Sequence, residues 1–399
     1  MLRKVSERPI TISLGDMFIL LYLLSFQLAG NGTGISKIMK VICAMVFIPC
    51  LIKNKKKMDA FAWWVIVYFI YVFMSKTWAL YNDYAKDAIY TVFFTMFCTY
   101  VCTQFFLKSK YNRIYYAKVS VFLPFIHYVY YILSNPVQNM FNLREGWLDQ
   151  SYNNIGLYAS FSVFFILAAF SENAIKHKNI YKFMIIMDIF LIVVSQSRKA
   201  ILYILIGIAV YYIVKSKNIF RSTLKFFVAA LAVVCFYFIA RFGYLGHYMQ
   251  DLIYAIEGSG TDSSYIGRIN QVDISMSLFN KNKFGGCGIG AIEYVCRFKH
   301  GQRAPIVDCD YLDLLADLGI IGLILFYGMF LYTLFLYLKC FSTWREIDRV
   351  CFAILIVLFF NGIVIRTYFN NYCVILTLFY VYKNIVDLKQ CNYLWRNRG

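Results

Sequence analysis

Charged residues are scarce in this 399-residue chain: they make up 15% of it, whereas 61% of the residues are hydrophobic. About a quarter of the residues of a soluble globular domain are charged, so the composition excludes that class. The chain also lacks any C-x-x-C pair with the spacing of zinc ligands. Most of its 12 cysteines lie in apolar runs, where a thiol is by default a small buried hydrophobe. We therefore predict a membrane protein with no metal and no cofactor.

Long apolar runs, by contrast, recur along the whole chain. Each has roughly 18 to 22 residues, enough for a helix to cross a hydrocarbon core of about 30 Å. The alternation over about 10 residues that marks a membrane-spanning strand is missing. We expect an all-α polytopic membrane protein with about 12 transmembrane helices. They are placed at about 11–29, 35–52, 59–78, 88–107, 115–134, 155–171, 183–195, 200–214, 226–243, 318–338, 350–365 and 372–384.

The net charge of +19 reflects topology rather than a nucleic-acid surface. Lysines gather in every second connection between the predicted helices, for example at 53–57, 108–113 and 215–225. Cytoplasmic connections of membrane proteins carry such an excess. The pattern predicts that both termini are cytoplasmic and that the longest connection, residues 244–310, lies outside. Residues 1–399 are expected to form one membrane domain, with this loop before the third-last helix.

The few basic residues on the predicted outer side are mostly arginines. They include Arg144, Arg198 with the adjacent Lys199, and Arg268. The planar guanidinium matches phosphate oxygens and stays charged beside hydrocarbon, so these groups suit a lipid-linked phosphate or pyrophosphate. The alternative is that each pairs with a carboxylate or a phospholipid head group. Arg198 is the most informative, because its very short connection holds it near membrane depth, where a basic residue is costly and usually functional.

Within the long loop, residues 265–279 read as an amphipathic helix. The apolar stripe comprises Ile269, Val272, Met276 and Phe279, at helical spacing. Arg268, Gln271 and Ser275 line the opposite side. Such a helix is expected to lie in the outer interface and to present Arg268 to an aqueous cleft. The alternative is an inert cover helix.

A glycine cluster follows this helix. It consists of Gly285, Gly286, Gly288 and Gly290. Glycine lets a backbone approach a ligand closely, but the pattern alone is weak, because no strand–turn–helix context supports a nucleotide site. A Cys287–Cys296 disulfide is an open alternative in an extracytoplasmic loop.

Three aspartates precede the next predicted span. Asp310, Asp313 and Asp317 are spaced three and four residues apart, so they share one helix face. We expect a solvated acidic face for at least two of them. The alternative is a carboxylate that acts as general base on a sugar hydroxyl.

Short motifs in this order resemble the O-antigen polymerase and O-antigen ligase superfamily, the Wzy/WaaL-like membrane glycosyltransferases. The segment 195–200, SQSRKA, is similar to that family's S-x-S/T-R-x-A segment at an outer helix junction. Gly267-Arg268, followed about seventeen residues later by FGGCGIG at 284–290, resembles its GR…FGxGxG loop. Arg144-x-Gly146 ahead of Asn153-Asn154 resembles a weaker element. The similarity in layout covers most of the chain and is sharp over 195–200 and 261–322.

One departure distinguishes two branches of the superfamily. Asp308-Cys309, followed by Gly319 and Gly322, resembles the ligase pattern of His-Asn, nine residues, Gly, two residues, Gly. Here Asp308 takes the histidine position and Cys309 the asparagine position, which favours a polymerase. His300, eight residues earlier, is a substitute base.

The resemblance implies a metal-independent glycosyltransferase with a GT-C-like arrangement at the periplasmic face of a bacterial inner membrane. Donor and acceptor would be oligosaccharides on undecaprenyl pyrophosphate, with a chain-length regulator as a further partner and no nucleic acid. Arg268 and Arg198, with Lys199 and Arg144, would hold the leaving pyrophosphate. Asp308 or His300 would take the proton of the attacking hydroxyl.

Two other functions stay open. A ligase would use the same chemistry with a lipid A core acceptor. A flippase or transporter for lipid-linked oligosaccharide belongs to another class; transporters usually show two related halves and broken helices at the midplane. No internal repeat is visible here, and the polar residues gather at one face. A passive scaffold would leave the outer arginines unexplained.

Overall fold

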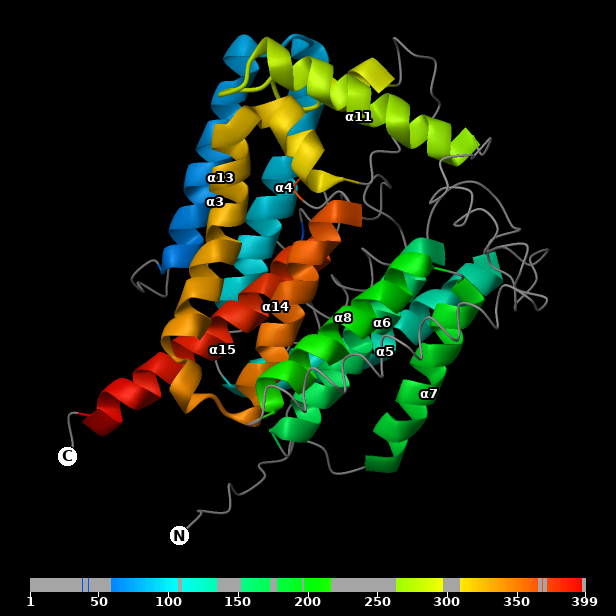
Figure 1. The fold of residues 1–399 in the computed structure, drawn as a ribbon, viewed down its shortest axis with the longest axis vertical. Coiled ribbons are helices and arrows are strands. Elements are labelled where there is room, and N and C mark those ends of the chain that lie inside the picture. Colours follow the sequence, from blue (N-terminus) through cyan, green and yellow to red (C-terminus); the bar gives the residue numbers. More distant parts are fainter. Residues whose placement is uncertain are drawn as a thin grey trace.

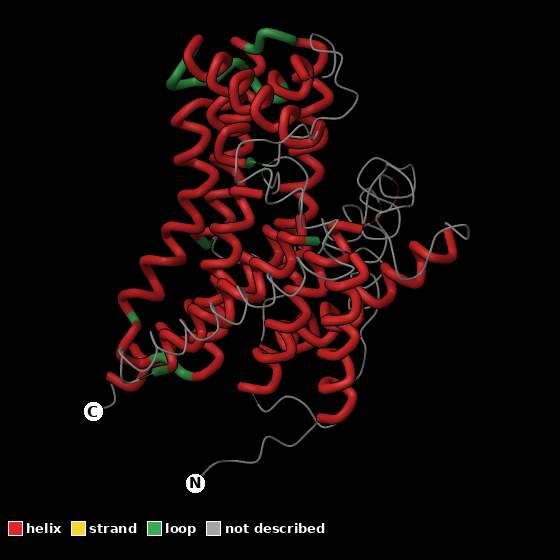
Figure 2. Tube along the Cα trace, turned by 45° about the vertical axis from the view of Figure 1, so that its right-hand side comes forward, coloured by secondary structure: helices red, strands yellow, loops and turns green. Residues whose placement is uncertain are grey.

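The protein is seen here in a computed structural model. It describes residues 38, 42, 59–106, 110–134, 152–172, 178–195, 197–216, 263–296, 309–364, 368 and 372–396. Throughout these ranges the regular structure is helical, without a strand (Figures 1 and 2). The all-α prediction is confirmed for this part of the chain. The predicted spans at 11–29 and 226–243, and all but two positions of 35–52, lie outside the described residues.

The observed elements follow the predicted order closely. They are α3 (Ala60–Met74), η1 (Ser75–Trp78), α4 (Asn82–Phe106), α5 (Lys110–Ser134), α6 (Tyr152–Ser171), α7 (Lys178–Ser195), α8 (Arg198–Lys215), α11 (Ser263–Lys281), α12 (Ala291–Tyr294), α13 (Asp310–Lys339), η3 (Phe341–Thr343), α14 (Glu346–Val364) and α15 (Tyr372–Arg396). Two boundaries differ by eight residues or more. Helix α13 begins at Asp310 instead of 318, and α15 runs on to Arg396 instead of ending at 384.

Three helices in the described part are long and apolar enough to cross a membrane: Ala60–Trp78, Arg113–Leu133 and Asp310–Lys339. A shorter apolar helix covers Ile155–Ser171. Each coincides with a span expected from the sequence. The total of about 12 spans and the GT-C-like arrangement stay predictions.

The helices form two groups that α14 connects. Helices α3, α4 and α13 stand together, and α5 to α8 form a second group (Figure 1). Helix α14 packs on α8 and α6 of the second group, on α13 of the first, and on α15. Helix α11 lies across one end of the group formed by α3, α4 and α13 (Figure 1).

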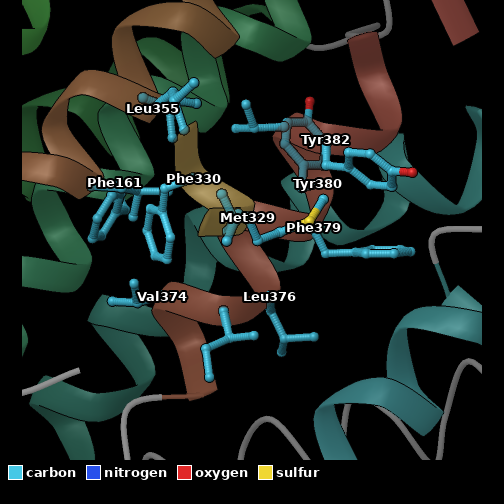
Figure 3. Packing of buried hydrophobic residues seen from close by; sticks show 14 of the residues in the cluster. Phe161, Met329, Phe330, Leu355, Val374, Leu376, Phe379, Tyr380 and Tyr382 are labelled. Atoms are coloured by element: carbon cyan, nitrogen blue, oxygen red, sulfur yellow. The ribbon is translucent and has the colours of Figure 1, made fainter. Parts of the chain in front are cut away.

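A shared core holds these helices together. Phe161 of α6, Phe330 of α13, Leu355 of α14 and Phe379 of α15 belong to one buried cluster (Figure 3). Lipid tails are as apolar as these side chains, so close packing rather than removal from water stabilises the contacts inside a membrane.

Polar contacts add to this packing inside the second group. Asp188 of α7 is fully buried and lies 2.6 Å from the Ser162 hydroxyl of α6, which is also 3.2 Å from the Val121 carbonyl oxygen of α5. One carboxyl group and one hydroxyl therefore join three helices. Interhelical hydrogen bonds of this kind contribute about 0.6 to 1.7 kcal/mol in a membrane protein.

We expect Asp188→Asn to keep this contact, because the amide oxygen occupies the place of a carboxylate oxygen without adding charge. Asp188→Leu removes it and is expected to cost about 1–2 kcal/mol in helix packing. Thermal unfolding in detergent, with both variants compared with the wild type, checks this. A loss of stability in the asparagine variant equal to that in the leucine variant would contradict a role in helix packing.

Candidate functional site

Residues 282–290, here called the glycine loop, are fastened to α13 by close backbone contact. Gly286 has φ +68°, and a Cβ there would lie 2.5 Å from both the Asp317 carbonyl oxygen and the Leu318 nitrogen. Gly288 and Gly290 have φ +92° and +80°. These left-handed conformations favour glycine. The glycines predicted as loop-site residues therefore let the loop approach protein backbone.

The glycine loop forms hydrogen bonds with α13 on both sides of a break in that helix. Gly319 has φ 67° and ψ −168°, which is non-helical. Before the break, the carbonyl oxygens of Ala316 and Asp317 accept hydrogen bonds from Cys287 N (2.9 Å) and Gly288 N (2.8 Å). After it, Ile320 N and Ile321 N donate to the Lys283 and Phe284 carbonyl oxygens at 2.9 and 3.2 Å. Backbone groups that a continuous helix would pair internally are thus paired by the loop.

The other side of the glycine loop is held by α3 and η1. Trp78 Nε1 donates to the Gly285 carbonyl oxygen at 3.0 Å, and Leu80 N donates to the Cys287 carbonyl oxygen at 2.9 Å. Tyr71 of α3 donates to the Leu318 carbonyl oxygen, next to the break, at 2.9 Å. The loop is therefore fixed between two helices, and the first nine residues of α13 form a distinct segment at that end.

This first segment of α13 carries the three aspartates, and all three are fully buried. The expectation of a solvated acidic face for at least two of them is wrong. The reason is that the glycine loop, α12 and Tyr368 cover this face. Asp317 Oδ2 accepts from Gly290 N (2.8 Å) and the Tyr368 hydroxyl (2.7 Å), and its Oδ1 accepts from Ile292 N (2.9 Å).

Asp310 is bound in the same manner. Its partners are two tyrosines that the sequence motifs did not indicate. Its Oδ2 accepts from the Tyr327 hydroxyl at 2.7 Å and its Oδ1 from Tyr368 N at 3.1 Å. Tyr368 thus bonds both Asp310 and Asp317. Its only sequence signal is its place in the short polar turn between the last two predicted spans.

The S-x-S-R-x-A segment lies at the junction of α7 and α8. A Cβ on Gly156 of α6 would lie 2.6 Å from Ser195 Oγ, 2.8 Å from Ser197 Cβ and 3.1 Å from Ala200 Cβ. The Ser160 hydroxyl also donates to the Ala200 carbonyl oxygen at 3.0 Å. The small residues of the motif therefore let α6 pack against the junction, as small residues do between membrane helices.

A chain of contacts connects this junction with the aspartates. Tyr203 of α8 donates to Asn361 Oδ1 of α14 at 2.9 Å. The neighbouring Gly362 has no room for a Cβ beside the hydroxyl of Tyr327, which bonds Asp310. The start of α8, where Arg198 is the first residue, and the start of α13 therefore lie toward the same end of the helices.

The other predicted site residues are placed as follows. Arg268 is in α11, which packs along α13. Lys199 is half-buried in the first turn of α8. Asp308, His300 and Arg144 lie outside the described residues; Cys309, directly after Asp308, is the N-cap of α13.

Helix α11 confirms the amphipathic helix that the sequence predicts. Gln271 and Ser275 are buried against the protein, and Val272 and Met276 are exposed. The open alternative of a Cys287–Cys296 disulfide is wrong, because neither sulfur takes part in a disulfide. Burial raises the pKa of the Cys287 thiol, so it is poorly suited to act as a thiolate nucleophile.

Residues 183–327 match the family model for O-antigen ligase. This segment is therefore similar to the O-antigen ligase family. The match confirms the resemblance to the O-antigen polymerase and ligase superfamily, whose members are membrane glycosyltransferase-like enzymes. It runs from α7 to Tyr327, so it includes the S-x-S-R-x-A junction, α11, the glycine loop and the broken part of α13. The matched segment covers a little over a third of the chain, and no curated protein sequence matches the chain.

Proposed function

We propose that this chain is a polysaccharide polymerase of the superfamily, acting on oligosaccharide repeat units carried by undecaprenyl pyrophosphate at the periplasmic face of a bacterial inner membrane. One observation carries the proposal. The motif-bearing elements of the segment that matches the O-antigen ligase family lie toward one end of the helices, where the glycine loop fixes the first segment of α13. A site for a lipid-borne substrate is expected at such an end, where polar groups meet the apolar span.

In the proposed reaction, a hydroxyl of the acceptor sugar attacks the anomeric carbon of the donor glycan. The bond between that carbon and the pyrophosphate oxygen breaks, and the pyrophosphate leaves with the electron pair. Arg198 and Arg268, supported by Lys199 and Arg144, bind the phosphate oxygens and stabilise the developing charge. Asp308 or His300 takes the hydroxyl proton. Asp310 and Asp317 already accept protein hydrogen bonds and are assigned to the scaffold.

The choice between polymerase and ligase rests on positions 308 and 309. The matching family model is that of the ligase, and its match supports both branches equally. Aspartate and cysteine stand where the ligase pattern has histidine and asparagine. A ligase that uses the histidine at its acceptor would lack that group here, so we favour the polymerase.

Polysaccharide length in a deletion strain tests the proposal. A polymerase deletion leaves a single repeat unit on the lipid A core, and the wild-type gene restores the ladder on a gel. Long lipid-linked polymer that never reaches the core would show a ligase instead. An unchanged ladder would contradict membership of either branch. With purified protein and labelled lipid-linked repeats, a flippase would move lipid without forming a longer chain.

A further inference from the structure

Helix α11 buries two polar side chains while it exposes two apolar ones. Its buried positions are Gln271, Ser275 and Leu278, whereas Val272 and Met276 on the other side are 43% and 39% exposed. A surface helix of a soluble domain normally buries its apolar stripe. The exposed side of α11 also carries Asp273 and Ser277, so the helix does not separate its polar residues from its apolar ones. The burial of Gln271 and Ser275 needs an explanation, because a buried polar group requires a hydrogen-bond partner.

Two buried polar side chains in the described part of α11 each have a polar atom with no hydrogen-bond partner. Gln271 is 2% exposed and Ser275 is 1% exposed. Neither Gln271 Nε2 nor Ser275 Oγ has a hydrogen-bond partner among the described residues. Buried polar groups are hydrogen-bonded in the large majority of cases, and an unpaired one costs stability. Two such groups one helical turn apart indicate a polar ligand rather than a structural role.

The position of the pair fits a ligand that enters beside α13. Helix α11 is anchored near its C-terminal end, where Leu278 packs against Cys287, Ile292 and Ala316. The glycine loop begins directly after this end and is bonded to α13. Gln271 and Ser275 lie further from the anchor, in the direction of Arg268, which is three residues before Gln271. A sugar near a pyrophosphate held by Arg268 would therefore reach them.

We propose that Gln271 and Ser275 form a recognition subsite for the sugar next to the pyrophosphate of the lipid-linked substrate. An amide and a hydroxyl are uncharged, so they complement sugar hydroxyl or acetamido groups rather than phosphate. A site built to hydrogen-bond such groups discriminates strongly against a substrate that lacks them. The pair binds and selects the sugar and takes no part in proton transfer. This inference rests on the proposed function.

The test uses purified full-length protein and the lipid-linked repeat unit extracted from the producing strain. Ser275→Ala and Gln271→Met are compared with Ser277→Ala, a matched change at an exposed position of the same helix. We expect each of the first two to raise KM about tenfold with kcat within about threefold, because a binding group is lost. Their Tm should be equal to or above that of the wild type, since an unsatisfied buried group is removed. Ser277→Ala should match the wild type.

Unchanged KM in both variants would overturn the subsite. A parallel loss of Tm and activity would also overturn it, because that is the signature of a structural role. The proposed function is tested independently of the subsite: it is wrong if the wild type elongates no lipid-linked repeat. Binding of the same lipid-linked repeat, followed by intrinsic tryptophan fluorescence, then decides the subsite: weaker binding by Ser275→Ala than by Ser277→Ala supports it, and equal binding overturns it.

Discussion

Gly286→Ala is expected to destabilise the protein by about 3 kcal/mol or more and to abolish chain elongation. Residue 286 has φ +68°, a conformation that costs an alanine of order 1 kcal/mol or more. The added Cβ would lie 2.5 Å from the Asp317 carbonyl oxygen and the Leu318 nitrogen. Both are backbone atoms at the break of α13, so the clash is relieved only if the loop leaves the helix.

Leaving the helix would break the hydrogen bonds of Cys287 N and Gly288 N to α13. It would also free Gly290 N and Ile292 N from the Asp317 carboxylate, so the first segment of α13 would lose its position. Gly285→Ala is the matched control. A Cβ there would meet side-chain atoms only, at 3.3 Å from Asn282 Nδ2 and 3.4 Å from Trp78 Nε1, and its φ is not positive.

Thermal unfolding in detergent measures the loss of stability, and the polysaccharide ladder on a gel measures the loss of chain elongation. Gly319→Ala should behave as Gly286→Ala does, because its Cβ would overlap the Phe284 carbonyl group. Gly328→Ala on the same helix meets nothing within 4 Å and should be neutral or slightly stabilising. If the Gly285 and Gly286 variants were equally stable, the glycine loop would not be what stabilises the break in α13.

The sequence predicted the helices well, because the length of an apolar run and the spacing of a stripe are local properties. Helix α11 was expected at 265–279 and spans Ser263–Lys281. The glycine cluster was predicted to let the backbone approach a ligand closely, and in the structure Gly286 lies against the backbone of α13. The sequence could not predict that α13 is the segment in contact, because a missing Cβ leaves space beside the backbone without indicating which group occupies it.

The error over the aspartates has the same origin. Their spacing correctly put Asp310, Asp313 and Asp317 on one face of a helix. Whether that face meets water depends on segments distant in sequence. The loop amides that bind Asp317 come from 25 and 27 residues earlier, and the Tyr368 hydroxyl from 51 residues later. No local pattern marks Tyr368 as the residue that joins Asp310 to Asp317.

Arg198→Ala and Arg268→Ala are each expected to lower the rate of elongation by about 10² to 10³-fold, with protein levels unchanged. The physical reason is the loss of a charged donor to the leaving pyrophosphate, and removal of one such preorganised donor has effects of this size in other enzymes. Single-turnover rates with labelled lipid-linked repeats, together with the gel ladder, measure the loss. The positions support the assignment, since Arg198 starts α8 and Arg268 lies in the helix that packs along α13.

Arg349→Ala is the control for a general effect of charge. Arg349 NH1 lies 3.0 Å from Glu346 Oε2, and Glu346 also pairs with Lys215, the last residue of α8. Helix α8 has 18 residues, so Lys215 lies about 26 Å along the helix from Arg198. A half-exposed ion pair of this kind contributes little to stability. The variant should elongate chains within twofold of the wild type.

Lysine variants separate charge from shape at the two proposed pyrophosphate ligands. Arg268→Lys keeps the positive charge and loses the planar fork that binds two phosphate oxygens at once. If that bidentate contact stabilises the leaving group, the lysine variant should stay at least tenfold below the wild type. Full activity of the lysine variant would reduce the role to simple charge attraction. Full activity of Arg268→Ala, at normal protein levels, would remove Arg268 from the site and leave Arg198 to hold the pyrophosphate.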